Sequence, residues 1–474
     1  MGRTVRAGLV RVALAAVGAS AGGVLLALAA QTPDPAETPA YCRLETRGTQ
    51  VELVRPAPGD PPIDDVNWFA RPVPNPAGHW IVGFASHDEN YLYDLTTGAR
   101  IRIPDRSDAV ATPDGRYITV PSHYTPDGTV NFYDLPALLA KLRAGEDASD
   151  VAPVFAHVDP DVADAYYQSV GVVSHDVQAE TERTVYRMMF SGSNVEPAPG
   201  FRIVDYEFVT SGGVPTVTPT RAMRLCPQIV EDMATPFISK DGRYIAAHDN
   251  SRPDTPPSLK IFAITATDPA SQATSCDERV DFRFAAGKAD FSYDGTALTF
   301  HISKFNYLTP FVNGGLVSPT ITDVVVVNLD VDAAGEIEGY TSLARVTTST
   351  TEGVGSYFPA FLPDGKLFYI SNTVPKNSDA PPRFHFTVVD PERERTFANF
   401  FADDRRRAVA ETIGELWRRT CAPALEPFQP NEAPWVLMSL PADQCRALVE
   451  AHGDDSEPAK ADLTAACGGA WSSE

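Results

Sequence analysis

Several motifs of common enzyme chemistry are missing from this sequence. It contains no Cys-x-x-Cys pair, which argues against a zinc ribbon, a thioredoxin-type dithiol and a c-type haem. After the apolar N-terminal segment it contains no Gly-x-Ser-x-Gly, the nucleophile motif of α/β-hydrolases. It also has no glycine-rich phosphate loop. These absences argue against a prolyl-oligopeptidase-like peptidase and against a protein with a zinc ribbon, a thioredoxin-type dithiol, a c-type haem or a phosphate loop.

Basic residues are scarce. The chain of 474 residues has 39 Lys and Arg against 62 Asp and Glu, which gives a net charge of −23. A surface of that sign repels nucleic acid and anionic lipid, so no nucleic-acid partner is expected. With so many acids, a carboxylate alone does not indicate catalysis. The hydrophobic share of 43% suits a globular protein with a sizeable core.

Residues 1–30 have the pattern of a secretory signal peptide. Three arginines precede an apolar run at 12–30, and Ala27-Leu28-Ala29 offers a small-x-small cleavage site. Because the apolar run is long, an uncleaved membrane anchor is the alternative, and only then is a membrane contact expected. Residues 31–49 are predicted to be a linker and N-terminal segment. The sequence therefore predicts a periplasmic or secreted protein.

All six cysteines lie beyond the signal pattern. An exported chain meets an oxidising compartment, so as many as three disulfides are expected. Six cysteines allow 15 pairings, and their spacing does not choose among them. Cys226 and Cys276 bracket one repeat and could clip it. The disulfide candidates are Cys42, Cys226, Cys276, Cys421, Cys445 and Cys467.

One hairpin signal recurs along the chain. In residues 235–250 an Asp241-Gly242 turn joins two short strand-like runs, and Gly suits such turns because it accepts positive φ. Third and fourth strand-like runs usually follow. Residues 166–209 form a degenerate copy without the Asp-Gly turn, and a short helix is predicted at 136–144. The other turn glycines are Gly78, Gly115, Gly295 and Gly365.

Repeats of about 40 to 60 residues with four short strands are typical of a β-propeller. One such sheet cannot bury both of its faces, whereas a ring of sheets can. A β-sandwich is the alternative, but a sandwich does not repeat one hairpin motif. The sequence thus predicts an all-β, six-bladed β-propeller of four-stranded antiparallel blades over 50–402. Apolar spacing predicts a short, disulfide-linked helical C-terminal extension over 403–474.

The repeated unit x-Pro/Lys-Asp-Gly-Arg/Lys-x-Ile/Leu resembles the blade motif of TolB-type six-bladed propellers. Residues 114–118, 241–245 and 364–367 carry it. The resemblance covers roughly Asn67 to Phe401. It implies the propeller fold and, by analogy, a part in an envelope assembly, but it says nearly nothing about activity. No Trp-Asp dipeptide marks a WD-repeat blade.

Histidines recur where the second strand of a repeat is expected to end. If these ends share one mouth of the channel, their side chains form a candidate ligand site there. Imidazole and carboxylate suit a divalent metal, with His248 and His301 as candidate ligands, and imidazole can act as a general base. Hydrogen bonds between neighbouring blades are the structural alternative. The candidate ligand-binding residues are His87, Asp88, His123, His175, Asp176, His248, Asp249, His301 and Asn372.

Residues 330–338 resemble the start of a calcium loop. Ala334 stands where a calcium loop needs an oxygen ligand, so a turn between the third and fourth strands of the fifth repeat is predicted instead.

A binding protein is the leading interpretation. No complete catalytic motif is present, so the sequence favours an exported, non-catalytic propeller that binds an envelope or extracellular protein, or a small ligand, at the channel mouth. A metal-dependent enzyme of hydrolase or lyase type that uses the ring of histidines is the alternative. No catalytic residue is assigned, and a divalent metal is the one cofactor considered.

Overall fold

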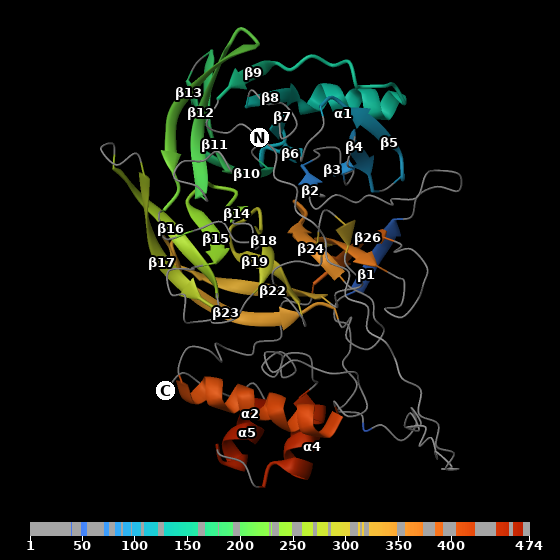
Figure 1. Ribbon diagram of the computed structural model, residues 1–474, viewed down its shortest axis with the longest axis vertical. Coiled ribbons are helices and arrows are strands. Elements are labelled where there is room, and N and C mark those ends of the chain that lie inside the picture. Colours follow the sequence, from blue (N-terminus) through green and yellow to red (C-terminus); the bar gives the residue numbers. More distant parts are fainter. Residues whose placement is uncertain are drawn as a thin grey trace, which may run out of the picture. The chain divides into compact units, whose positions relative to one another are not determined.

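Figure 1 shows the computed structural model of the chain. Two compact units divide the chain, Met1–Thr38 and Pro39–Glu474, and the second contains the elements described below. The predicted signal peptide, nearly all of the predicted linker and Cys42 lie outside the described residues. The structure describes residues 39, 49–54, 71–74, 81–86, 89–95, 97–105, 109–121, 128–159, 166–178, 180–192, 200–226, 229, 237–248, 258–268, 273–282, 286–303, 311–312, 315–316, 322–347, 356–372, 384–391, 404–421, 442–454 and 458–467.

The first two repeats form separate four-stranded antiparallel sheets. A helix, α1 (Leu135–Ala144), follows the third strand of the second sheet, and the Asp134 carboxylate caps it by accepting a hydrogen bond from the Ala137 N–H. The first meander consists of β2 (Arg71–Val73), β3 (Ile81–Ser86), β4 (Glu89–Asp94) and β5 (Arg100–Ile103). The second meander consists of β6 (Val110–Ala111), β7 (Tyr117–Pro121), β8 (Thr129–Asp134) and β9 (Phe155–Val158).

The third and fourth repeats are joined into one eight-stranded sheet. Each is a four-stranded antiparallel meander, and a single parallel pair, Arg224 with Ala273, connects them. The third meander consists of β10 (Tyr166–Gln178), β11 (Thr181–Gly192), β12 (Gly200–Ser211) and β13 (Val214–Arg224). The fourth meander consists of β14 (Phe237–Ile238), β15 (Tyr244–His248), β16 (Leu259–Asp268) and β17 (Ala273–Asp281).

The last two repeats complete the β-structure. The sixth meander takes its outer strand from the other end of the chain, because β1 (Thr49–Val54) pairs with β26. A two-stranded ribbon, β20 (Phe311–Val312) with β21 (Gly315–Leu316), stands apart from the meanders. The fifth meander consists of β18 (Gly287–Phe291), β19 (Ala297–Ser303), β22 (Thr322–Val331) and β23 (Ile337–Arg345). The sixth consists of β24 (Ser356–Phe361), β25 (Leu367–Asn372), β26 (Phe384–Asp390) and β1.

The four described Asp-Gly turns between first and second strands share one hydrogen-bond pattern, which explains the repeated motif. In the fourth meander the Gly242 N–H donates to the Ser239 carbonyl (2.9 Å), and the Arg243 N–H donates to the Asp241 carboxylate (3.1 Å). Gly242 has φ of +72°, a conformation that favours glycine. The same two contacts recur in the turns around Asp114, Asp294 and Asp364.

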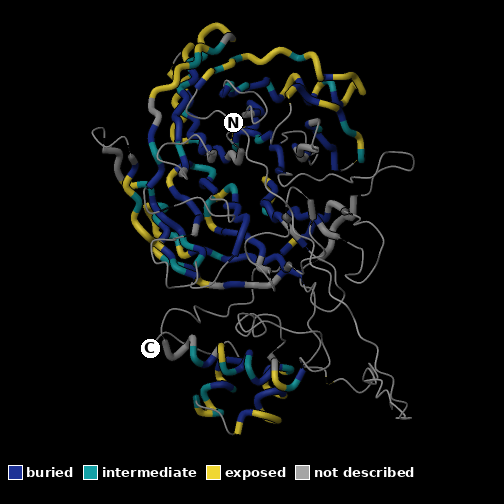
Figure 2. Tube along the Cα trace, in the orientation of Figure 1, coloured by how far each residue is buried: buried dark blue, intermediate teal, exposed yellow. Residues whose placement is uncertain are grey.

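The cores lie between neighbouring sheets. Between the second and third meanders, for example, the rings of Tyr117, Phe132, Tyr186 and Phe208 pack edge to face or tilted. Figure 2 shows that the inner strands are mostly buried, whereas exposed stretches follow the long strands of the third meander. Packing between sheets, not within one sheet, therefore supplies the core, as expected for a propeller.

Three helices form a small cluster of their own at the C-terminal end of the sequence. They are α2 (Asp404–Cys421), α4 (Ala442–His452) and α5 (Lys460–Cys467), and all lie within the predicted helical extension over 403–474. Trp417 and Leu416 of α2 are buried, as are Leu448 of α4 and Leu463 of α5. A disulfide joins Cys445 to Cys467, and Cys421 is disulfide-bonded too.

The prediction of six separate four-stranded sheets is not confirmed. The described strands form five sheets of four or more strands and the two-stranded ribbon. The difference lies between the third and fourth meanders, where a disulfide joins Cys226 to Cys276. The Cys226 N–H also donates to the Thr274 hydroxyl (2.9 Å), so the ends of β13 and β17 lie side by side. The disulfide that was considered as a clip is therefore present, and beside it the pair of Arg224 with Ala273 joins two sheets that were predicted to be separate.

No described helix is both long and apolar enough to cross a membrane.

Candidate binding site on the turn face

The site lies at one end of the meanders. We call this end the turn face; it is the end at which the first and second strands of each meander are joined. A cavity of about 130 Å³ opens there between the fourth and fifth meanders. Both Asp-Gly turns and the turn between β22 and β23 contribute to it. The lining residues are Ser239, Lys240, Asp241, Arg243, Tyr244, Phe291, Ser292, Tyr293, Asp294, Gly295, Val331, Gly335 and Ile337.

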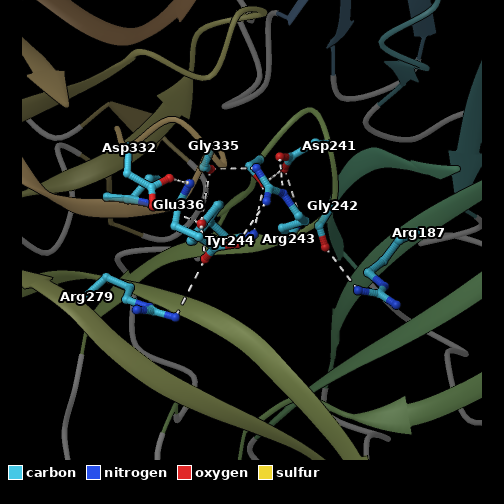
Figure 3. A network of polar contacts seen from close by, with 11 residues as sticks. Arg187, Asp241, Gly242, Arg243, Tyr244, Arg279, Asp332, Gly335 and Glu336 are labelled. Carbon is cyan, nitrogen blue, oxygen red and sulfur yellow. Dashed lines mark hydrogen bonds and ion pairs between the residues drawn. The ribbon is translucent and has the colours of Figure 1, made fainter. Parts of the chain in front are cut away.

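Arg243 is the centre of the polar network on one wall of this cavity (Figure 3). Its guanidinium donates to Asp241 (2.7 Å), to Glu336 (3.1 Å) and to the Gly335 carbonyl (2.7 Å). The Tyr244 hydroxyl donates to Glu336 (2.8 Å) and accepts from the Ile337 N–H (3.1 Å). The two meanders are thus held together by charged and neutral hydrogen bonds at the rim.

The network fixes the charges on this wall. Burial opposes ionisation of Asp241, but hydrogen bonds from Ser239 and Arg243 outweigh it and lower the pKa of the carboxyl. The hydrogen bond to Asp241 raises the pKa of Arg243. Burial raises the pKa of Tyr244. The wall therefore carries a carboxylate, a guanidinium and a neutral phenol across the ordinary pH range.

A second polar cluster lies beside the cavity, on two of the turns and two of the inner strands. The Lys240 ammonium donates to the Asp290 carboxylate (2.8 Å), whose other oxygen accepts from the Phe361 N–H (2.9 Å) in β24. Lys240 also lies 5.0 Å from the centre of the Tyr293 ring. Burial and then the charge of Asp290 raise the pKa of Tyr293. Three meanders meet at this ion pair.

The size and lining of the cavity limit what it can hold. Pockets for drug-sized ligands measure about 300 to 1,000 Å³, so this cavity is too small for such a molecule. Phe291, Val331 and Ile337 give it apolar walls, whereas the charged groups at the rim already have partners. A single apolar or amphipathic side chain from another protein fits these conditions, as an anchor residue does at an interface.

His301 is buried between the fifth and sixth meanders at the end opposite the turn face. Its Nδ1 accepts a hydrogen bond from the Phe358 N–H (3.3 Å), so the proton of the neutral ring is on Nε2. Burial, and then the charge of Lys288, lower the pKa of His301 to about 3. Phe358 and Lys288 both have positive φ, +50° and +55°, at irregularities in β24 and β18. This hydrogen bond joins two neighbouring meanders, which is the structural alternative considered above for the recurring histidines.

His175 is not at the end of a second strand. It lies in β10, the first strand of its meander, opposite Thr184 of β11 and close to the turn that joins the two. Arg116 and His175 both contact Glu182 there. The expected placement of His175 and Asp176 is therefore wrong: they lie toward the turn face, whereas His301 lies toward the other end. Because the third repeat lacks the Asp-Gly turn, the sequence did not show that His175 and Asp176 belong to a first strand.

The other predicted site residues are only partly described. His248 ends β15 and Asn372 ends β25, as expected from the sequence. His87, Asp88, His123 and Asp249 lie outside the described residues. Within the described part of the chain, no group of three or more His, Cys, Asp or Glu side chains could hold a metal ion. The metal site stays a prediction.

Sequence reasoning missed the cavity on the turn face. Its wall residues belong to the Asp-Gly motif, which serves the hairpin, and nothing in the motif distinguishes a binding role. The calcium-like segment was correctly interpreted as a turn: the Asp332 carboxylate accepts from the Ala334 and Glu336 N–H groups (2.8 and 2.7 Å). That this turn meets Arg243 could not be predicted, because 93 residues separate Arg243 from Glu336.

The sheets define a β-propeller. No family model matches the sequence, and no curated protein matches it. The TolB-type resemblance is not confirmed.

Several solved structures share the general fold. One is the calcium-binding protein regucalcin from Agrobacterium tumefaciens, which is 11% identical, with 74% of this chain and 96% of that chain covered and a TM-score of 0.33. Another is the Cps50 (Swd1) β-propeller domain of Myceliophteria thermophila, which is 9% identical, with 73% and 98% covered and a TM-score of 0.30. A third is the PQQ-bound aldose sugar dehydrogenase of Streptomyces coelicolor, which is 12% identical, with 73% and 100% covered and a TM-score of 0.35.

Proposed function

We propose that this protein is an exported, non-catalytic scaffold that binds another protein on its turn face. The observation that supports this most directly is the cavity between the fourth and fifth meanders, which is sized for one side chain and has apolar walls inside a paired polar rim. Interfaces commonly place an anchor side chain in such a pocket, surrounded by polar groups that exclude water.

We further propose that the ring has six blades. The eight-stranded sheet then counts as two blades joined by the Cys226–Cys276 clip. The first strands support this count, because β2, β6, β10, β14, β18 and β24 contact one another in that order and β24 contacts β2 again. Six inner strands that contact one another in a closed cycle correspond to six blades, whatever the number of hydrogen-bonded sheets.

Export is part of the proposal. Disulfides persist in oxidising compartments, and the Cys226–Cys276 and Cys445–Cys467 bonds favour a periplasmic or secreted location. The signal-like pattern of residues 1–30 agrees with this. Cell fractionation with N-terminal sequencing of the mature protein tests it, since a cytoplasmic protein that keeps residues 1–30 would contradict export.

The binding proposal is tested by filling the cavity. Val331 ends β22 and lines the cavity, so Val331→Trp should occupy it and weaken binding of the partner at least tenfold. The partner is first identified with a photo-crosslinking amino acid at position 331 in the envelope or secreted fraction. Binding of that purified protein to each variant is then measured by calorimetry.

Val158→Trp is the matched control. Val158 ends the outer strand β9 of the second meander and is exposed, away from the cavity. Both variants should unfold within about 1 kcal/mol of the parent protein. Equal binding by the two variants, or robust turnover of a substrate by the purified protein, would contradict the proposal.

The alternative function, a metal-dependent enzyme, is supported by no contact among the described residues. Elemental analysis of untagged protein tests it, together with His248→Ala and His301→Ala variants.

A further inference from the structure

The first two strands of the third meander are much longer than their counterparts. β10 has 13 residues and β11 has 12, whereas the first strands of the other meanders have 2 to 6. Figure 1 shows the third meander as the set of long green strands. The extra length must extend past the neighbouring meanders at one end.

Two close contacts fix which end extends. The Val172 N–H donates to the Lys240 carbonyl (2.7 Å), and a Cβ on Gly171 would lie only 2.6 Å from the Gly242 Cα. Gly171 and Val172 are thus level with the Asp-Gly turn of the fourth meander. Residues 174–178 lie beyond that turn, and at about 3.3 Å per residue they make roughly 16 Å of strand. On the β11 side, the turn of the second meander reaches this segment through Arg116, which contacts Glu182 opposite Val177.

The projecting part of β10 is an open strand edge. β10 is the terminal strand of its sheet among the described residues, and residues 173–178 are all exposed. Val177 is 62% exposed and Val173 is 39% exposed, and these are two of the four large hydrophobic side chains exposed in the described part of the chain. An exposed edge with apolar side chains favours the addition of another strand.

The other edge of this meander is protected. Apart from the pair at Arg224, β13 has no described partner on its outer side, and it carries Pro215 and Pro219. Proline has no N–H to donate and commonly blocks strand addition at edges. Residues 172–178 contain no proline and no glycine. The meander thus closes one edge and leaves the other open.

The charges at the open edge are negative. Asp176 and Glu180 are exposed, and neither forms an ion pair with a Lys or Arg among the described residues. Arg183, which lies opposite Asp176 on β11, is paired with Glu207 instead. Glu182, in contrast, is paired with Arg116. The whole chain carries −23, so a cationic partner is attracted at long range as well as at the edge.

We propose that the projecting edge of β10, residues 174–178, binds an extended segment of a partner protein by strand addition. The segment alternates apolar and basic side chains. Successive side chains of β10 point to opposite faces of the strand. Val177 therefore contacts the apolar side chains of the added segment, and Asp176, on the other face, contacts its basic side chains. This inference rests on the proposed protein-binding function and names the chemistry of the partner.

The test uses a defined probe, the peptide acetyl-Val-Lys-Val-Lys-Val-Lys-Val-amide. Its binding to the full chain should slow hydrogen exchange of the backbone amides of residues 174–178. Two control peptides accompany it: one with Glu in place of Lys, and one methylated at alternate backbone nitrogens, which keeps the charge but cannot pair. Neither should slow exchange at these residues.

Protein variants supply the second arm. Val177→Lys and Asp176→Lys should each raise the Kd of the peptide at least tenfold, whereas Val158→Lys on the outer strand β9 should change it less than twofold. Both test positions are exposed, so the variants are expected to fold, which circular dichroism checks. Failure of the peptide to bind the parent protein, or binding without protection of residues 174–178, would overturn the inference.

The outcome can be separated from that of the proposed function. If Val331→Trp abolishes binding of the natural partner while Val177→Lys leaves it intact, the turn face is the binding face but strand addition at β10 is wrong. If neither variant affects a partner that binds the protein, both proposals are wrong.

Discussion

At the scale of single residues, Gly171 shows how closely two meanders approach. The Cβ of any other residue there would lie 2.6 Å from the Gly242 Cα, the Gly242 nitrogen and the Ser239 carbonyl oxygen, all of which are backbone atoms of the next Asp-Gly turn. Backbone atoms cannot rotate away as a flexible side chain can. Gly171→Ala is therefore expected to lower the free energy of unfolding by about 3 kcal/mol, as measured by chemical denaturation.

Gly339 provides the control for this prediction. It also lies in a strand, β23, but nothing lies within 4 Å of the position that its Cβ would occupy. Gly339→Ala should be neutral or stabilise the protein by less than about 1 kcal/mol. A similar effect of the two substitutions would show that strand propensity, and not the contact between meanders, governs Gly171.

His301 couples stability to pH. Burial, and then Lys288, lower its pKa to about 3 in the folded protein, against about 6.5 in an unfolded chain. Between these values the unfolded chain binds a proton that the folded protein does not. The contribution of His301 to stability is therefore complete above pH 6.5 and is lost as the pH falls toward 3. Each pH unit in this window should cost about 1.4 kcal/mol from this group.

His301→Asn tests the effect of pH. Asparagine can accept a hydrogen bond from the Phe358 N–H, and it does not titrate. Between pH 4 and 6 the free energy of unfolding of the variant should fall less steeply than that of the parent, by about 1.4 kcal/mol per pH unit. The paired carboxylates contribute equally to both proteins. Parallel pH profiles would show that His301 is protonated in the folded protein.

At the scale of strands and turns, local signals predicted most of the fold. The Cys226–Cys276 disulfide, between residues 50 apart, was one of the pairings that the sequence left open. The Asp-Gly turns, the helix at α1 and the helical C-terminal extension were expected from residues close in sequence. These elements depend on φ preferences, capping and apolar spacing, which act over a few residues. The bounds of domains and the signal peptide stay predictions.

Contacts between meanders were not predictable in the same way. The parallel pair of Arg224 with Ala273 turned two expected sheets into one, and no local signal marks it. Because the third repeat lacks the Asp-Gly turn, no local signal indicated that β10 and β11 continue past the neighbouring turn. The position of His175 was misjudged for that reason. The candidate site consists of such contacts: Arg243 and Glu336 come from different meanders.

At the scale of the whole molecule, ring closure depends on one strand from the N-terminal side. β1 pairs with β26, from Thr49 with Asp390 to Val54 with Phe386, and so completes the sixth meander. The residues of β26 that pair with β1 lie more than 300 residues further along the chain. Closing so long a loop costs only slightly more entropy than closing a shorter one, so this pairing can stabilise the ring.

Glu52→Pro with Leu53→Pro tests this role of β1. Neighbouring strand residues direct their N–H groups to opposite sides, so one of the two prolines must remove a hydrogen bond to β26. The double variant should lose about 3 kcal/mol or more of stability, and hydrogen exchange should become faster in β26 and β25. The double alanine variant keeps both N–H groups and serves as the control for lost side chains. If exchange in β26 is unchanged by the prolines but the control loses equal stability, the side chains of β1, and not its backbone pairing, hold the sixth meander closed.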